Sequence, residues 1–111
     1  MATVTPKPLA QGVLLAASAG TIYTTPASTT ATVRSMTFCN TDTVSRTITV
    51  YLVPSGGAIG DASTILKTLS ILANETIIDD TLRVLATGDF ISALSDAANK
   101  VSMRVDGAEV T

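Results

Sequence analysis

Residues 46–54, RTITVYLVP, decide the fold class, because their side chains alternate between two faces with a strict period of two. Ile48, Val50 and Leu52 fall on one face of an extended chain, and hydroxyl-bearing and mixed residues fall on the other. Alternation of this kind, with many β-branched residues, is typical of a strand that lies on a core. The segment therefore predicts a half-buried β-strand.

A glycine-rich loop, PSGGAIGDAS at residues 54–63, follows this strand. A phosphate-binding P-loop needs a Lys and then Ser or Thr directly after its last glycine. Here Gly60 is followed by Asp61, whose carboxylate would repel a phosphate. We therefore expect an inter-strand loop and no phosphate site.

The remainder of the chain contains further short segments with strand patterns, separated by turn compositions. In the clearest of them, Val101, Met103 and Val105 are expected to point inward. In residues 32–40, Met36 and Phe38 are expected on one face, with Val33 and Cys39 on the other. The other expected strands are residues 13–16, 20–25, 64–72, 76–85 and 90–95.

This spacing predicts an all-β fold: a single small antiparallel β-sandwich or jelly-roll-like barrel with about seven or eight strands. An alternative helix in STILKTLSILANE, residues 63–75, stays open, because Leu66, Leu69 and Leu72 also have helical spacing.

The first twelve residues are expected to form an extended N-terminal arm on a domain of residues 13–111. Pro6 and Pro8 favour extended backbone for themselves and for the residues before them. Two alternatives remain for this arm: it lies on a neighbouring subunit, or it adds an edge strand to its own domain.

The composition excludes several classes of protein. Only 14% of the residues are charged and the net charge is −2, whereas ordinary domains contain about 25% charged residues. The surface is rich in hydroxyls, with 19 Thr and 10 Ser, which suits a protein whose faces are covered by neighbours. The seven basic residues are scattered, so nucleic acid is not an expected partner. No apolar stretch reaches the length of about 18 residues that a membrane span requires, so no membrane partner is expected.

The sequence also argues against an enzyme. It contains no His, the most common general acid–base group and metal ligand, and Cys39 is the only Cys. The adjacent carboxylates Asp79 and Asp80 would point to opposite faces of a strand. We therefore expect no catalytic residues, no cofactor, no metal and no small-molecule substrate.

Several segments resemble a group of small tailed-bacteriophage virion proteins. The similar segments are TIYTTPAST (21–29), VRSMTFCNT (33–41), ITVYLVPSGG (48–57), LATGD (85–89) and a Gly near the end of the last strand, Gly107. The resemblance covers roughly residues 17–111 and rests on turns and apolar alternation. It implies a β-sandwich structural or accessory protein of the decoration or fibre-module type, and it carries no catalytic motif.

The sequence thus predicts a non-enzymatic virion structural protein, located in the phage particle and made in the cytoplasm of the bacterial host. The leading hypothesis is a head decoration (cement) protein that binds the outside of the capsid and stabilises it. The alternative is a tail, neck or fibre component that acts as an adaptor or receptor-binding module. A carbohydrate-binding module is a third hypothesis, disfavoured because the chain has no Trp.

The expected partners are the major capsid protein, or tail and neck proteins, and other copies of the same chain. The residues expected to contact other subunits are Pro6, Pro8, Leu9 and Val13 of the arm, and Gly57 and Ile59 of the glycine-rich loop.

Overall fold

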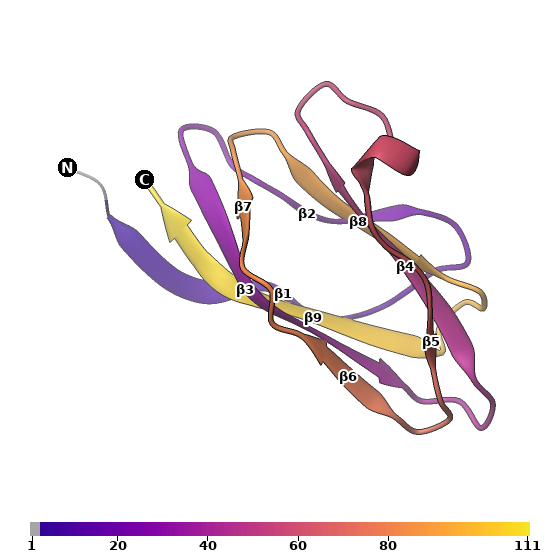
Figure 1. The fold of residues 1–111 in the computed structure, drawn as a ribbon. Coiled ribbons are helices and arrows are strands. Elements are labelled where there is room, and N and C mark those ends of the chain that lie inside the picture. The colour runs from indigo at the N-terminus through magenta and orange to yellow at the C-terminus, as the bar shows by residue number, and fades with distance from the viewer. Residues whose placement is uncertain (1–2) are drawn as a thin grey trace.

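A computed structural model describes residues 3–111 and confirms the all-β fold. In this part of the chain, nine strands and one short 3-10 turn form two antiparallel sheets that pack face to face (Figure 1). The elements are β1 (Val4–Leu14), β2 (Gly20–Thr24), β3 (Thr30–Asn40), β4 (Arg46–Val53), η1 (Asp61–Ser63), β5 (Thr64–Ile71), β6 (Thr76–Asp79), β7 (Arg83–Leu85), β8 (Phe90–Ser95) and β9 (Val101–Val110).

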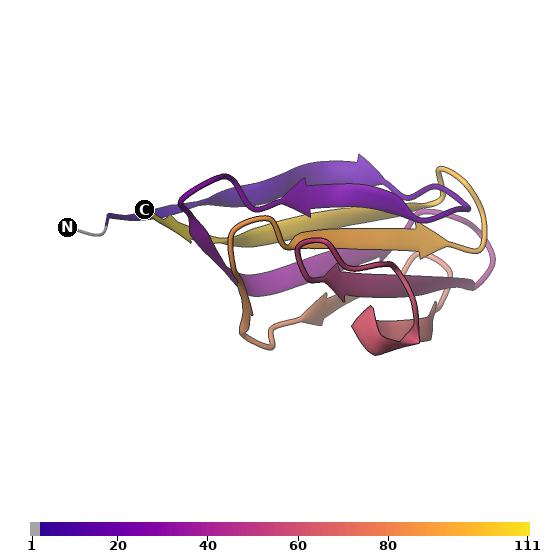
Figure 2. The same cartoon turned by 90° about the horizontal axis from the view of Figure 1, so that it is seen from above.

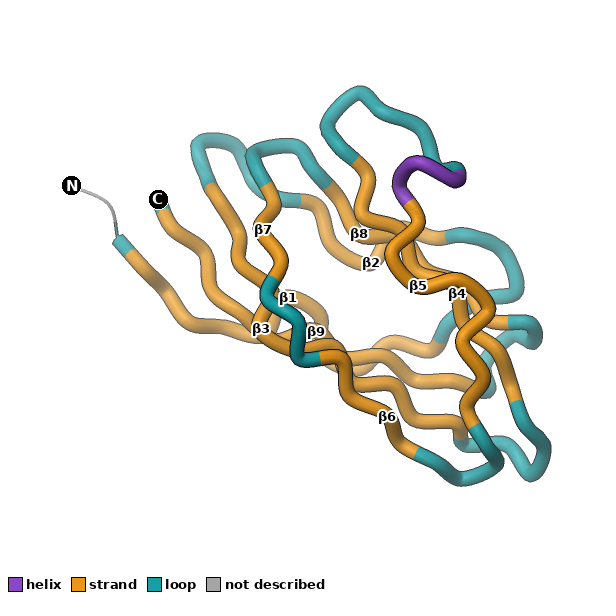
Figure 3. Tube along the Cα trace, viewed as in Figure 1, coloured by secondary structure: helices purple, strands orange, loops and turns teal. Residues whose placement is uncertain are grey.

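The strand order is that of a jelly roll. Sheet A has the order β1-β9-β3-β6, with β7 also paired to β3, and sheet B has the order β2-β8-β4-β5. β6 and β7 lie end to end along β3 and together occupy one strand position, with a break at residues 80–82 between them (Figure 3). The chain passes repeatedly from one sheet to the other, so each sheet combines strands that are distant in sequence. Two such four-position sheets make the eight-stranded jelly roll.

The antiparallel course of the strands defines two ends of the sandwich. The terminal end carries the start of β1, the end of β9 and the loops at residues 25–29, 54–63 and 86–89, and Figure 2 shows the start of β1 beside the end of β9. The distal end carries the loops at residues 15–19, 41–45, 72–75 and 96–100.

The core lies between the two sheets and is made mostly of aliphatic side chains. As expected from their alternation, Ile48 and Val50 of β4 are fully buried, with Leu52 packed against them. β9 contributes the fully buried residues Val101, Met103 and Val105, as expected. Segment 64–71 is the strand β5, so the helical alternative for residues 63–75 is wrong.

One expectation for β3 is wrong. Val33 shares the buried face with Met36 and Phe38, because a bulge between Val33 and Ser35 shifts the register against β9. An extra residue in a strand reverses the alternation beyond it. As expected, Cys39 falls on the opposite face from Phe38; it is half-buried with a free thiol.

The same bulge brings β9 unusually close to β3 at Gly107. A Cβ atom at this position would lie 1.9 Å from the carbonyl oxygen of Thr32 and 3.2 Å from the Cα of Val33. Only a residue without a side chain fits so close to another backbone.

No helix in the described residues is long and apolar enough to cross a membrane.

Candidate interaction surfaces

The N-terminal segment forms the edge strand β1 and pairs with β9 of its own chain from Val4 to Leu14. Of the two alternatives for the arm, this single chain adopts the edge strand for residues 4–12, whereas residues 1–2 lie outside the described part. The strand spans the expected boundary between residues 12 and 13, with a register shift between Ala10 and Val13.

The pattern of hydrogen bonds explains why two prolines are compatible with β1. The backbone groups of Thr3 and Thr111 exchange two hydrogen bonds, of 2.7 and 2.9 Å. Because the peptide groups of an antiparallel strand face alternate sides, the backbone N–H and C=O groups of Thr5 and Lys7 also face β9. Pro6 and Pro8 therefore occupy positions that face the free edge, where the missing N–H costs no ladder hydrogen bond.

The four arm residues expected to contact other subunits occupy two kinds of environment. Pro6 is exposed and Pro8 is half-buried, so both remain accessible. Leu9 is only 8% exposed and belongs to the core, and Val13 is partly buried against it. In this chain Leu9 and Val13 therefore serve the domain's own packing.

Three polar side chains connect β1 and β9 of sheet A with β2 of sheet B at the terminal end. The ammonium of Lys7 lies 3.2 Å from Glu109 Oε1 on β9, and the hydroxyl of Tyr23 on β2 donates to the other oxygen of Glu109. The hydrogen bond from Tyr23, together with that from Lys7, lowers the pKa of Glu109. Burial, and then the hydrogen bond to Glu109, raises the pKa of Tyr23.

The glycine-rich loop is closed by its own polar groups. The N–H of Gly57 donates to the carbonyl of Pro54 at 2.8 Å, and the N–H of Gly60 donates to the Ser63 hydroxyl at 3.1 Å. A Cβ on Gly57 would lie 2.9 Å from the ring of Pro54, so this glycine is required by the turn. Ile59 is 42% exposed. Contacts of Gly57 and Ile59 with other subunits stay a prediction.

The outer face of sheet A is uncharged toward the terminal end. Pairing places Pro6, Ala108, Thr32 and Val84 in one row across β1, β9, β3 and β7, and residues in such a row share a face. A second row holds Val4, Val110 and Thr30. Charge returns at the bulge itself with the exposed Arg34, and beyond it with the exposed pair of Arg104 and Asp106, 3.0 Å apart.

Exposed aliphatic residues also gather along β6 and β7, which sequence reasoning did not single out. Ile78, Leu82 and Val84 are 65%, 63% and 58% exposed. Their inward-facing neighbours Ile77 and Leu85 pack on the core. The sequence signal was present: a strand in residues 76–85 with apolar residues on both faces has one apolar face outside.

A network of buried and half-buried polar groups holds the loops of the distal end together. The Asn40 side chain is fully buried, and its Nδ2 donates to the carbonyls of Val44 at 2.9 Å, Ile71 at 3.0 Å and Leu72 at 3.2 Å. Its Oδ1 accepts from the N–H of Asp42 at 2.9 Å. The amide thus joins the end of β3 to two loops.

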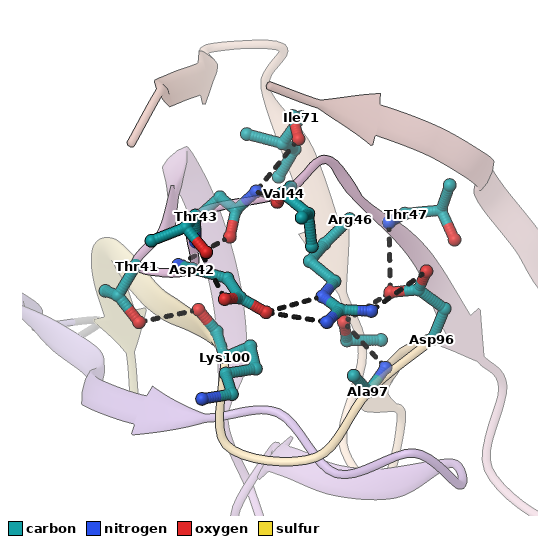
Figure 4. A network of polar contacts seen from close by, with 12 residues as sticks. Thr41, Asp42, Thr43, Val44, Arg46, Thr47, Ile71, Asp96, Ala97 and Lys100 are labelled. Atoms are coloured by element: carbon teal, nitrogen blue, oxygen red, sulfur yellow. Dashed lines mark hydrogen bonds and ion pairs between the residues drawn. The ribbon is translucent and has the colours of Figure 1, made fainter. Parts of the chain in front are cut away.

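Beside Asn40, the guanidinium of Arg46 donates to Asp42 Oδ2 at 2.6 and 2.9 Å and lies 3.9 Å from Asp96 (Figure 4). The hydrogen bond from Arg46, and then that from the Thr43 N–H, lowers the pKa of Asp42. All of these groups are paired with one another, so the network is an internal brace of the loops.

The described residues contain no pocket and no group of three His, Cys, Asp or Glu side chains placed to hold a metal ion. Asp79 and Asp80 are separated as expected. Asp79 accepts a hydrogen bond of 2.9 Å from Arg83, whereas Asp80 is exposed.

No family model and no curated protein sequence matches this chain. Solved structures share its fold. A chain of Bacillus endospore appendages, which form disulfide-linked pili, is similar with a TM-score of 0.59 and 18% identity, over 100% of this chain and 90% of that chain. A chain of infectious bursal disease virus, Gx strain, is similar with a TM-score of 0.50 and 11% identity, over 99% of this chain. The similarity spans 31% of that viral chain. At these identities the likeness concerns the fold alone.

Proposed function

We propose that this protein is a non-enzymatic structural subunit of a bacteriophage particle, a head decoration protein that binds the outside of the capsid and stabilises it. The observation that carries the proposal is the uncharged outer face of sheet A at the terminal end, where Val4, Pro6, Thr32, Val84 and Val110 belong to adjoining rows. A surface of this kind is suited to cover by another protein.

Three further observations support a structural role. A similar fold occurs in a chain of Bacillus endospore appendages, which form pili, and in a chain of infectious bursal disease virus. The sequence segments at residues 21–29, 33–41 and 48–57 resemble tailed-phage virion proteins. The low content of charged residues, 14%, suits a protein that works while bound to its neighbours.

The mechanism follows from linkage. A protein that binds the assembled shell and not the free capsid subunits shifts the equilibrium toward the shell, by an amount that grows with its concentration over its Kd. In this proposal the outer face of sheet A lies on the capsid surface, and Pro6 and Pro8 at the exposed edge contact the adjoining capsid subunit.

Deletion of residues 1–7 tests the arm contact without removing the core residue Leu9. The segment 3–7 is exposed, so the truncated domain should stay folded, with a modest loss of melting temperature from the missing β1–β9 hydrogen bonds. We expect the truncated protein to lose binding to particles that lack the wild-type protein, in a sedimentation assay. Full occupancy by the truncated protein would contradict the role of the arm.

Copy number in the intact particle tests the location. Quantitative mass spectrometry should find the protein in proportion to the major capsid protein, at hundreds of copies per particle. A count of a few to tens of copies would instead assign the chain to the tail, neck or fibre, and its absence from purified particles would overturn the virion assignment.

A further inference from the structure

The four edges of the two sheets differ in how they are protected against pairing with another strand. Exposed strand edges template the addition of foreign strands, and proteins commonly block them with Pro, Lys, bulges or very short strands. Three of the four edges carry Pro, Lys or register shifts; on the fourth, β6 and β7 are short strands of four and three residues with a break between them, but they contain neither Pro nor Lys. On β1, Pro6 and Pro8 remove two donors from the free side, and the exposed Lys7 lies between them.

Sheet B is protected at both sides. β5 is interrupted by two register shifts against β4, Thr68 within it has a φ of 45°, and the side chain of Lys67 is 70% exposed at its middle. β2 has only five residues and a register shift between Thr21 and Tyr23. It also lies against β1, to which the Tyr23 and Lys7 contacts with Glu109 tie it.

The fourth edge, β6 and β7, presents free peptide groups together with aliphatic side chains. The N–H of Asn40 donates to the carbonyl of Glu75 at 2.9 Å. By alternation, Ile77 and Asp79 also face β3, so the peptide groups of Thr76 and Ile78 face outward. Within residues 3–111, no strand pairs with this outer side.

The same alternation applies to β7. The Thr87 hydroxyl accepts from the N–H of Thr29 at 3.0 Å and donates to its carbonyl at 2.7 Å. The backbone groups of Thr29 therefore face β7. Ala31 lies two residues further along β3, so its backbone groups face β7 as well. Leu85 is paired with Ala31 and faces β3, so the peptide groups of Val84 face outward.

The break between β6 and β7 preserves the alternation of the edge, because Asp79 and Arg83, four residues apart, both pair with β3. It lies opposite the bulge of β3, and the ion pair between Asp79 and Arg83, 2.9 Å long, joins its two sides. Neither Pro nor Lys occurs between Thr76 and Leu85.

We propose that two copies of this chain pair antiparallel through their β6–β7 edges, about a two-fold axis near Thr81. The edge is complementary to itself in this arrangement. Ile78 lies opposite Val84 of the partner subunit, a favourable pair of β-branched residues on one face. Asp80 lies opposite Leu82 of the partner subunit, so the two exposed carboxylates do not meet.

A second copy is the occupant that these residues favour. A two-fold axis gives both partners the same contacts, so a single edge suffices for both sides of the interface. The aliphatic side chains offer no charge with which a charged partner would be recognised. Pairing also places the A sheets of the two copies side by side, so their outer faces form one continuous surface. The proposal concerns the chain by itself and holds or fails independently of the virion assignment.

Lysine substitution at Ile78 or Val84 tests the interface, with Val4→Lys as the matched control. Val4 is 63% exposed, close to the 65% of Ile78, but lies on the blocked edge of the same sheet. Sedimentation velocity up to about 1 mM, where even weak pairing is populated, should give a wild-type dimer. We expect Ile78→Lys and Val84→Lys each to raise the dimer Kd about tenfold or more, and Val4→Lys to leave it within about twofold. Thermal melts establish that each variant is folded.

Amide hydrogen exchange separates edge pairing from any other contact. The N–H groups of Ile78 and Val84 should exchange more slowly as the protein concentration rises. The N–H of Ile77, already directed to β3, should not change. The proposal is overturned if the wild type stays monomeric up to about 1 mM. It is equally overturned if Ile78→Lys and Val4→Lys dimerise alike, or if the Ile78 and Val84 rates are independent of concentration.

Discussion

Replacement of Gly107 by Ala tests the closest approach between two strands of the core. The added Cβ would lie 1.9 Å from the carbonyl oxygen of Thr32 and 3.0 Å from its carbonyl carbon. Carbon–oxygen contacts between strands are ordinarily about 3.3 Å or longer, so the two backbones must part by roughly 1.4 Å. Neither contact is to the end of a flexible side chain, and relief therefore requires movement of β3 or β9.

The expected cost follows from that movement. A shift of this size takes a hydrogen bond of about 2.9 Å beyond the usual limit near 3.2 Å. About two ladder hydrogen bonds next to Gly107 would be lost, at about 1 kcal/mol each, and the remaining strain of overpacking adds about 1–3 kcal/mol. We expect a loss of about 3–5 kcal/mol, which is a large part of the 5–15 kcal/mol that stabilises a typical domain.

Thermal and urea unfolding followed by circular dichroism measure this loss. The melting temperature should fall by at least about 12 °C, given about 4 °C or more per kcal/mol for a domain of this size. Gly20→Ala is the control, because a Cβ there meets nothing within 4 Å, and it should change stability by less than about 0.5 kcal/mol. A melting temperature of the Gly107→Ala protein within about 2 °C of the wild type would refute the reasoning, since the close approach would then impose no constraint.

Three further predictions concern polar groups. Asn40→Leu should cost about 2–4 kcal/mol in urea unfolding, because it leaves buried carbonyls at the distal end without a donor; an unchanged urea midpoint would contradict the brace. Burial opposes ionisation of Asp79, but hydrogen bonds from Thr81 and Arg83 outweigh it and lower its pKa. Its contribution is therefore present above the unfolded pKa near 4 and is lost as pH falls through the lower folded value, so Asp79→Asn should flatten the decline of melting temperature below about pH 4. Because burial and then Glu109 raise the pKa of Tyr23, stability should fall as pH rises above about 10, and Tyr23→Phe should remove part of that fall in alkaline melts.

The parts of the fold that the sequence predicts are those in which one regular strand faces one core. Ile48, Val50, Val101, Met103 and Val105 follow simple alternation and are all fully buried. Their strands are bounded by recognisable turn compositions, so local chemistry and tertiary structure agree.

The errors lie where tertiary contacts override alternation. The bulge of β3 brings Val33 to the buried face, and a bulge depends on the partner strand as much as on the local sequence. In β1, the consecutive residues Leu9 and Ala10 are both buried, next to two register shifts and the left-handed Gly12. Neither arrangement has a signature in a single sequence.

The candidate contacts were only partly predictable for the same reason. Leu9 and Val13 are apolar residues near a proline-rich terminus, which fits both a docking arm and a core edge strand, and pairing with β9 decides between them. In the sequence alone, Ile78 and Val84 have the pattern of ordinary strand residues. Their significance depends on which side of the strand is left without a partner, and that follows from the topology.

The position of β9 determines when sheet A can fold during synthesis of the chain. Of the nine strands in residues 3–111, β9 leaves the ribosome after the other eight, yet it lies between β1 and β3, so sheet A has no continuous ladder until residues 101–110 have emerged. Until then β1 lacks its hydrogen-bonding partner and one side of β3 is open, and contacts between residues so distant in sequence form slowly. A nascent chain therefore completes sheet A only after residues 101–110 have been synthesised. Ribosome stalling or truncation before Val101 would release a chain with exposed strand edges, a substrate for chaperones and proteases.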